Sequence, residues 1–203
     1  MSSEPLLSVA GLTKHYPVRK GVLNREVGRV RAVDGIGFDQ SRGETLGLVG
    51  ETGSGKSTAA RCLLRIEEPT EGVVRFDGKD VLALEGKDLK RFRRRTAMVF
   101  QDATSSFDPR TTVGESVAEP LRVHGLRDRA RRRAIVEELI DRVGLSTADF
   151  DRYPHEFSGG QKQRLALARA LVINPDFIVA DEPVSALDVS VQASILSLIE
   201  ELQ

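Results

Sequence analysis

The stretch "GETGSGKS", residues 50–57, decides the fold. It fits the pattern G-x-x-x-x-G-K-[ST], and it lies between an apolar run at residues 45–49, predicted as a strand, and a helical pattern at residues 56–65. Glycines let backbone N–H groups curl around a phosphate chain, and the following helix N-terminus adds partial positive charge. Lys56 would reach the β and γ phosphates of a nucleotide, and the Ser57 hydroxyl can bind magnesium. The stretch therefore predicts a phosphate-binding loop.

A second set of polar residues follows two other apolar runs. Residues 177–180, "FIVA", predict a buried strand that delivers Asp181 to its tip, where the carboxylate can hold the same magnesium ion. Glu182 is one step further out, where it could polarise an attacking water as a general base. Gln101 ends another predicted strand at residues 97–100; its amide oxygen could bind metal or water, or it could be an ordinary surface glutamine. Tyr16, predicted in an early loop, could equally stack on adenine or belong to the core.

The order of the predicted elements indicates an α/β protein. Strand signals at residues 6–12, 30–33, 36–39 and 73–76 come early, with a turn predicted at Asp34-Gly35, and a basic helix follows at 87–95. Between residues 113 and 143 strand signals vanish, and residues 129–143 form an amphipathic helix with Gly144 as its stop. Further helices are expected at 161–172 and 191–202. Strands without polar alternation indicate a parallel sheet covered on both faces.

A second glycine-rich helix start lies at Ser158-Gly159-Gly160. Bare N–H groups and a hydroxyl at a helix N-terminus form an anion site. One nucleotide held by residues 50–57 does not need it. The simplest explanation is that it closes over the γ-phosphate of a nucleotide held by another subunit, so that two subunits arranged head to tail enclose two nucleotides.

Composition narrows the class of protein. The chain has 203 residues, with 30 basic and 30 acidic side chains, so no global field draws it to nucleic acid. Basic clusters at residues 90–95 and 127–133 are interpreted as solvated helix faces, and no nucleic-acid partner is expected. No apolar run is long enough for membrane insertion, which predicts a soluble cytoplasmic protein. The single cysteine, Cys62, is expected to be a buried apolar residue.

The motifs together resemble a known family. "GETGSGKST", "VFQ", "FSGGQKQR", "IVADEP" and "SALD" occur in the order and spacing of the nucleotide-binding domains of ATP-binding cassette (ABC) proteins. "SSFDPRTTVGESVAEPL" and "RYPHEFSGGQKQR" resemble the ATP-binding subunits of oligopeptide and dipeptide importers. The resemblance implies a P-loop NTPase with a RecA-like core at residues 1–101 and 158–203, an N-terminal antiparallel β subdomain, and a helical subdomain at 102–157.

The same resemblance implies an ATPase that uses ATP and Mg²⁺ to power import of peptides or similar solutes through a separate membrane permease. It would lie at the cytoplasmic face of the membrane, dock on the permease through residues 102–157, and pair with an identical or a paralogous subunit. Glu182 and Gln101 would be catalytic, and Ser57, Gln101 and Asp181 would hold the metal. The implied nucleotide-binding residues are Tyr16, Gly50, Thr52, Gly53, Ser54, Gly55, Lys56, Ser57, Thr58, Ser158, Gly159, Gly160, Gln161 and Asp188.

Two alternative functions remain open, and the sequence differs from the family's pattern in one respect. A non-transport ABC ATPase or a non-catalytic nucleotide-binding regulator would share the same motifs. The family's pattern continues with a further core strand and a histidine that contacts the γ-phosphate, whereas His15, His124 and His155 all precede Asp181. We therefore expect the 203 residues to be an incomplete nucleotide-binding domain, truncated at its C-terminus.

Overall fold

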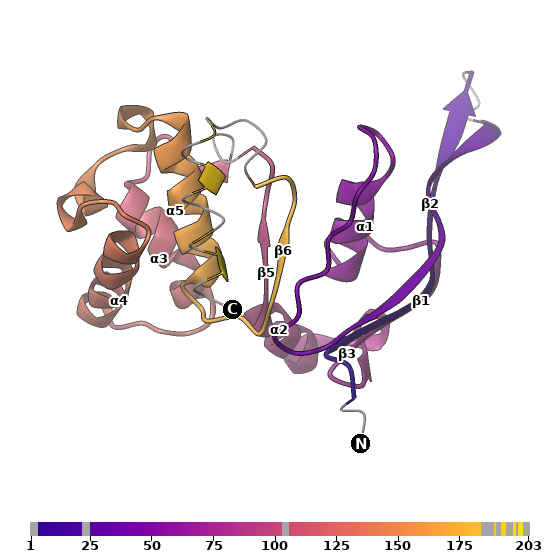
Figure 1. The fold of residues 1–203 in the computed structure, drawn as a ribbon, viewed down its shortest axis with the longest axis horizontal. Helices are drawn as coiled ribbons and strands as arrows, with labels where there is room; N and C mark the ends of the chain where they lie inside the picture. The colour runs from indigo at the N-terminus through magenta and orange to yellow at the C-terminus, as the bar shows by residue number, and fades with distance from the viewer. Residues whose placement is uncertain are drawn as a thin grey trace. The chain divides into compact units, whose positions relative to one another are not determined.

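The computed structural model describes residues 4–21, 25–102, 106–183, 189, 192, 193, 197, 199 and 200. The packing of the chain defines two units, Met1–Phe92 and Arg93–Gln203, and Figure 1 labels most of their helices and strands. Among the described residues, no helix combines the length and the apolar character that crossing a lipid bilayer requires.

The first unit contains an antiparallel sheet with the strand order β2-β1-β3-β4. Its strands are β1 (Leu7–Lys20), β2 (Arg25–Gln40), β3 (Glu71–Phe76) and β4 (Lys79–Asp80). β1 and β2 pair from Leu7 opposite Gln40 to Lys20 opposite Arg25, and they form the long ribbon in Figure 1. The N-terminal antiparallel β structure expected from the resemblance is therefore present.

The predicted turn at Asp34-Gly35 is a β-bulge within one continuous strand. Ile36 pairs with Leu12 and Val33 pairs with Lys14, so two residues of β2 face the single residue Thr13. Gly35 has a φ of 72°, which a glycine adopts without steric cost, and its N–H donates to the hydroxyl of Thr13 at 3.1 Å. The turn signal therefore corresponds to a real backbone irregularity. The strand nevertheless continues past it, because β2 pairs with β1 on both sides of the bulge.

Two other local expectations differ from the structure. Tyr16 lies in β1, paired with Val30, and not in a loop. Residues 45–49 form no strand, and the side chains of Leu46, Leu48 and Val49 are exposed. A strand exists only when its backbone N–H and C=O groups pair with a neighbouring strand, and no described segment pairs with residues 45–49.

The helices of the first unit follow the sequence pattern closely. α1 (Lys56–Leu63) begins directly after the glycine-rich loop, and Cys62 on its inner face is fully buried, which confirms the expectation for that residue. The short 3₁₀ helix η1 (Val81–Ala83) is capped by the side chain of Asp80. α2 (Gly86–Arg95) is basic on its outer face and buries Phe92, whose ring meets that of Phe76 edge-on at 5.4 Å between centroids.

The second unit combines two parallel strands with a group of helices. Its elements are β5 (Thr96–Val99), α3 (Val113–Val123), α4 (Arg129–Arg142), the 3₁₀ helices η3 (Thr147–Asp151) and η4 (Pro154–Glu156), α5 (Gly159–Leu171) and β6 (Phe177–Ala180). Apolar side chains of β5, α3, α4, η3 and α5 form one core that includes Val117, Ile140, Phe150 and Leu165. The boundaries of a separate helical subdomain at 102–157 stay a prediction.

Helix ends in this unit have identifiable causes. Asp128 caps α4 by accepting a hydrogen bond from the N–H of Arg131. At the other end Gly144 has a φ of 74°, which confirms the predicted stop, and Arg164 of α5 donates to the carbonyl of Val143 at 2.8 Å. Most of the final predicted helix, 191–202, lies outside the described residues.

Candidate functional site

The phosphate-binding loop leads into α1 through a glycine that no other residue could replace without distortion. Gly55 caps α1 with a φ of 95°, a left-handed conformation that disfavours side chains. A Cβ atom added to Gly55 would lie 1.8 Å from the carbonyl oxygen of Ala32 in β2. At Gly55 the loop therefore rests directly on the main chain of β2, and residues 50–54 are exposed.

Lys56 lies across this loop. Its Nζ donates to the carbonyl oxygens of Gly50 at 2.7 Å and Glu51 at 2.8 Å. Neutral carbonyls are weaker partners for an ammonium group than charged phosphate oxygens, so a phosphate chain entering the loop can take their place. The loop thus holds a positive charge in position for an anion.

Tyr16 is brought close to the start of α1 by the fold. Its hydroxyl lies near the side chains of Glu67 and Thr58, and the Nζ of Lys14 lies 5.0 Å from the ring centroid. Burial and the nearby carboxylate of Glu67 raise the pKa of Tyr16 above its ordinary value. The aromatic ring is therefore held near the helix that follows the phosphate-binding loop, as a base-stacking role would require.

In the second unit, the parallel pairing of β5 and β6 brings two predicted catalytic residues together. Val99 lies opposite Ala180, so Gln101 and Glu182 each follow their strand by two residues at the same edge of the sheet. Nε2 of Gln101 donates to a carboxylate oxygen of Glu182 at 2.8 Å. The structure therefore places side by side two residues that are 81 positions apart in the chain.

Asp181 and Glu182 occupy different environments although they are adjacent. The backbone N–H of Asp181 donates to the carbonyl of Val99 at 2.9 Å, and Asp181 is only 7% exposed. Glu182 has a φ of 46°, a left-handed conformation that is uncommon for a residue with a side chain. Asp181 is buried whereas Glu182 is partly exposed, so the two carboxylates lie in different surroundings.

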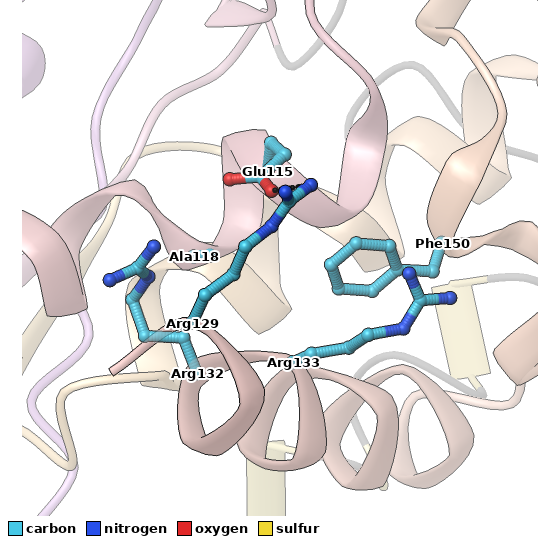
Figure 2. Close-up of a pocket in the computed structure, with 6 residues that line it drawn as sticks. All are labelled: Glu115, Ala118, Arg129, Arg132, Arg133 and Phe150. Carbon is cyan, nitrogen blue, oxygen red and sulfur yellow. Dashed lines mark ion pairs between the residues drawn. The ribbon is translucent and has the colours of Figure 1, made fainter. Parts of the chain in front are cut away.

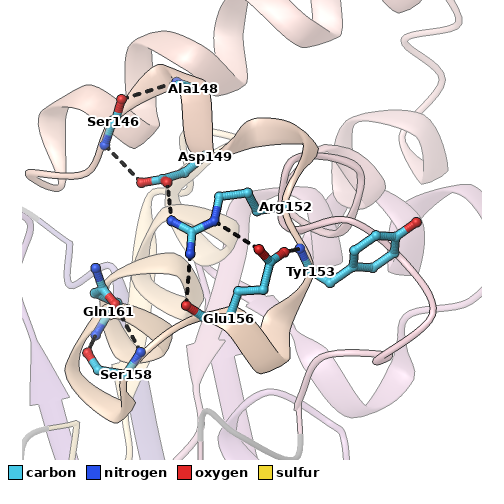
Figure 3. A network of polar contacts seen from close by, with 8 residues as sticks. All are labelled: Ser146, Ala148, Asp149, Arg152, Tyr153, Glu156, Ser158 and Gln161. Atoms are coloured by element: carbon cyan, nitrogen blue, oxygen red, sulfur yellow. Dashed lines mark hydrogen bonds and ion pairs between the residues drawn. The ribbon is translucent and has the colours of Figure 1, made fainter.

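The second glycine-rich helix start is an ordered cap. The hydroxyl of Ser158 accepts from the N–H of Gln161 at 3.3 Å, and the N–H of Ser158 donates to Oε1 of Gln161 at 2.9 Å (Figure 3). This reciprocal pair is a capping box. A Cβ atom on Gly159 would meet nothing within 4 Å, so there is open space beside the first turn of α5. The helix start is therefore ordered, and its role as an anion site stays a prediction.

The segment that leads into this cap contains a polar network that we did not predict from the sequence (Figure 3). Arg152 makes ion pairs with Asp149 at 2.8 Å and Glu156 at 3.3 Å, and it also donates to the carbonyl of Glu156 at 3.0 Å. The sequence signal is the spacing of acidic residues three before and four after an arginine in "DFDRYPHE". Asp188, the remaining predicted site residue, lies outside the described residues.

A hollow of about 420 Å³ opens beside α3 in the second unit. It is lined by Ser106, Asp108, Thr111, Glu115, Ser116, Glu119, Arg122 and Arg169. Arg169 of α5 spans it by donating to the carbonyl of Ser106 and to Glu119. All of its lining residues except Arg169 lie within the predicted helical region, residues 102–157, and all of them are polar or charged.

The geometry of the loop, the strand edge and the helix cap agrees with the family match. The sequence profile described as ABC transporter matches residues 33–185. The chain therefore belongs to the ABC transporter family.

The relatives that it matches carry transport or import functions in their names. It is 49% identical over 203 residues to the oligopeptide transport ATP-binding protein AppF of Bacillus subtilis, covering all of this chain and 62% of AppF. It is 50% identical over 201 residues to the glutathione import ATP-binding protein GsiA of Pectobacterium atrosepticum, covering 99% of this chain and 32% of GsiA. The chain thus spans less than two thirds of the length of these relatives.

Solved structures of ABC cassettes have the same fold. The dimeric cassette MJ0796 bound to ADP and Pi superposes with a TM-score of 0.84 at 31% identity, covering 97% of this chain and 82% of that chain. cbiO1 of Clostridium perfringens, part of the transporter complex cbiONQ, gives a TM-score of 0.77 at 27% identity, covering 98% and 74%. The similarity confirms the predicted P-loop NTPase fold.

Proposed function

We propose that the chain is the nucleotide-binding part of an ATPase that powers import of peptides or similar small solutes. The observation that carries the nucleotide part is the loop at residues 50–57, where Gly55 rests on β2 and Lys56 crosses the loop carbonyls. The names of the relatives support the import part.

The residues present fit ATP with magnesium. Gly55 seats the loop on β2, residues 50–54 are exposed, and a glycine-rich loop at a helix N-terminus suits phosphate oxygens. Ser57, Asp181 and Gln101 offer a hydroxyl, a carboxylate and an amide oxygen, which are the hard oxygen ligands that Mg²⁺ accepts alongside phosphates and water. The bound ion would neutralise charge on the phosphates.

Glu182 is the proposed general base. Its carboxylate would take a proton from water as the water oxygen bonds to the γ-phosphorus and the bond to ADP breaks, which yields ADP and phosphate. The hydrogen bond from Gln101 supports this role because it holds the carboxylate at the strand edge. A glutamine that donates from its amide nitrogen keeps its amide oxygen available for the metal ion or the water.

The first turn of α5 would bind the γ-phosphate of a nucleotide held by a second subunit. The open space beside Gly159 and the ordered cap of Ser158 and Gln161 support this arrangement. In the same dimer Asp188 would lie at the interface and Tyr16 would stack on adenine. The dimeric state named for MJ0796 agrees with a two-subunit assembly.

The predicted helical subdomain, residues 102–157, would dock on a membrane permease and hold the protein at the cytoplasmic face of the membrane. The polar hollow beside α3 supports this, because it offers carboxylates and arginines to an inserted segment. The assembly named for cbiO1 is consistent with a permease partner.

The test is the substitution Glu182→Gln in the full-length protein. It removes the base and keeps the shape and the hydrogen-bonding capacity, so ATP should still bind, hydrolysis should stop, and ATP-bound dimers should accumulate in size-exclusion chromatography. Glu138→Gln, an exposed glutamate of α4, is the matched control and should hydrolyse ATP normally. Hydrolysis that survives in Glu182→Gln would rule out the proposed base, and a wild-type protein that binds ATP without hydrolysing it would indicate a regulator.

A further inference from the structure

We propose that Arg152 is a positioning residue for the phosphate-binding end of α5. This proposal rests on the proposed function of Ser158 as a γ-phosphate ligand. Arg152 itself does not touch the cap; it fixes the path of the chain that leads into it.

The guanidinium of Arg152 donates to three acceptors, one on Asp149, which precedes it in the chain, and two on Glu156, which follows it (Figure 3). One terminal nitrogen donates to Oδ1 of Asp149 at 2.8 Å, and the other donates to the backbone carbonyl of Glu156 at 3.0 Å. Nε donates to Oε1 of Glu156 at 3.3 Å. The rigid fork of an arginine suits this task because its donors point in fixed directions.

Each of the two carboxylates also holds a backbone N–H group. Oδ2 of Asp149 accepts from the N–H of Ser146 at 3.2 Å, which closes the capping box of η3. Oε2 of Glu156 accepts from the N–H of Tyr153 at 2.6 Å at the start of η4. Arg152 therefore joins the starts of two consecutive 3₁₀ helices into one rigid piece.

The network extends directly to the cap of α5. The guanidinium carbon of Arg152 lies 4.7 Å from the ring centroid of Phe157, which is buried, and Phe157 immediately precedes Ser158. The carbonyl of Arg152 accepts from the N–H of Val113 at 2.9 Å, so the piece is also tied to the start of α3. The main chain on the N-terminal side of Ser158 is thus fixed by the side chain of Arg152 and by the burial of Phe157.

The network contributes both to stability and to position. The side chain of Arg152 is 42% exposed, so water and salt screen its ion pairs, whereas its partner Asp149 is only 12% exposed. Position matters more, because a shift of about 1 Å in a group that contacts the reacting phosphate can lower a rate by about a hundredfold.

Arg133 provides a matched control (Figure 2). Its side chain is 43% exposed, it pairs with Glu137 at 2.7 Å and Asp151 at 2.8 Å, and it lies 4.2 Å from the ring centroid of Phe150. Like Arg152, it combines two ion pairs with a ring contact, but its partners Glu137 and Asp151 are 33% and 69% exposed and belong to α4 and η3, not to η4. Loss of Arg133 should remove a similar surface network and leave the path into α5 intact.

The experiment compares Arg152→Gln and Arg133→Gln in the full-length protein. Arg152→Gln should lower kcat for ATP hydrolysis at least about tenfold and change the affinity of the monomer for a fluorescent ATP analogue less than about twofold. Arg133→Gln should leave both unchanged. Arg152→Lys keeps the charge but cannot span all three acceptors, so it should have intermediate activity and serves as the test variant if Arg152→Gln does not fold.

A double-mutant cycle with Ser158→Ala separates positioning from a general structural effect. If Arg152 acts through Ser158, its loss should have little further effect on kcat once Ser158→Ala is present, whereas unrelated changes should multiply. Fully multiplicative effects, or equal kcat values for Arg152→Gln and Arg133→Gln, would overturn the positioning role. The proposed function would fail separately, through a wild-type protein that neither hydrolyses ATP nor dimerises with it.

Discussion

Replacing Gly55 by alanine should separate the loop from the strand on which it rests. Gly55 has a φ of 95°, and its new Cβ would lie 1.8 Å from the carbonyl oxygen and 2.9 Å from the carbonyl carbon of Ala32. Both neighbours are main-chain atoms, so no side-chain rotation can relieve the contact. The loop must move away from β2 until the atoms reach ordinary contact at 3.4 Å or more.

The magnitude follows from two contributions. A left-handed conformation costs an alanine about 1–2 kcal/mol, and forcing an extra methyl group into a packed site typically costs about 1–3 kcal/mol more. Together they disfavour the binding-competent loop by roughly 2–5 kcal/mol, which raises the apparent Kd for ATP by about 30-fold to several thousandfold.

Gly53→Ala is the matched control, because Gly53 also has a positive φ, 82°, but its Cβ would meet nothing within 4 Å. Only the cost of the left-handed conformation applies to Gly53→Ala, so this variant should raise the Kd for ATP about 5- to 30-fold. The assay is fluorescence titration with a nucleotide analogue, with circular dichroism as a check on folding. Equal affinities of the two variants would refute the argument that the loop is seated on Ala32.

Three further predictions concern charge, packing and burial. Lys56→Ala removes charge-assisted hydrogen bonds worth about 1.5–3 kcal/mol, so calorimetric titration should show ATP binding weakened about 10- to 150-fold; unchanged affinity would exclude Lys56 as a phosphate ligand. Gly114→Ala would place a Cβ 2.3–2.4 Å from ring atoms of Phe150. Overpacking should lower the free energy of unfolding by about 1–3 kcal/mol, less up to about 1 kcal/mol gained from the higher helix propensity of alanine, and urea unfolding should show this as a lower midpoint. A higher midpoint would contradict this packing. Burial raises the pKa of Cys62 from 9.0 to about 11, so the folded protein keeps a proton that the unfolded chain loses above pH 9.0. The corresponding stability is present below pH 9.0 and is lost as the pH rises toward 11, so the Tm of Cys62→Ala should fall less steeply over that window than the Tm of the wild type.

Local sequence patterns predicted the elements whose cause is local. The strand at residues 177–180 matches β6 in its bounds, although Ile178 and Ala180 are exposed and not buried as expected, and the glycine stop at Gly144 ends α4. Ser158 followed by Gln161 is a capping-box pattern, and it forms as such. Each of these features depends on hydrogen bonds or backbone preferences within a few residues, so the sequence contains the information.

Longer-range features were less accessible. The apolar run at residues 45–49 has the composition of a strand, yet none of the described segments pairs with it. The Asp34-Gly35 signal indicated a turn, but pairing with β1 converts it into a bulge. Strand formation depends on a partner that the run itself does not specify, and local propensity is weaker than that pairing.

The sequence by itself determined the chemical groups of this protein: a glycine-rich loop with Lys56, two carboxylates after an apolar strand, and a capped helix start at Ser158. Only the tertiary structure decided which groups meet. It set Gln101 2.8 Å from Glu182 through the register of β5 and β6, and it connected Arg152 to Asp149, Glu156 and Phe157. The physical reason is that motif chemistry depends on residue type and short spacing, whereas these contacts depend on strand register and side-chain packing between separate elements.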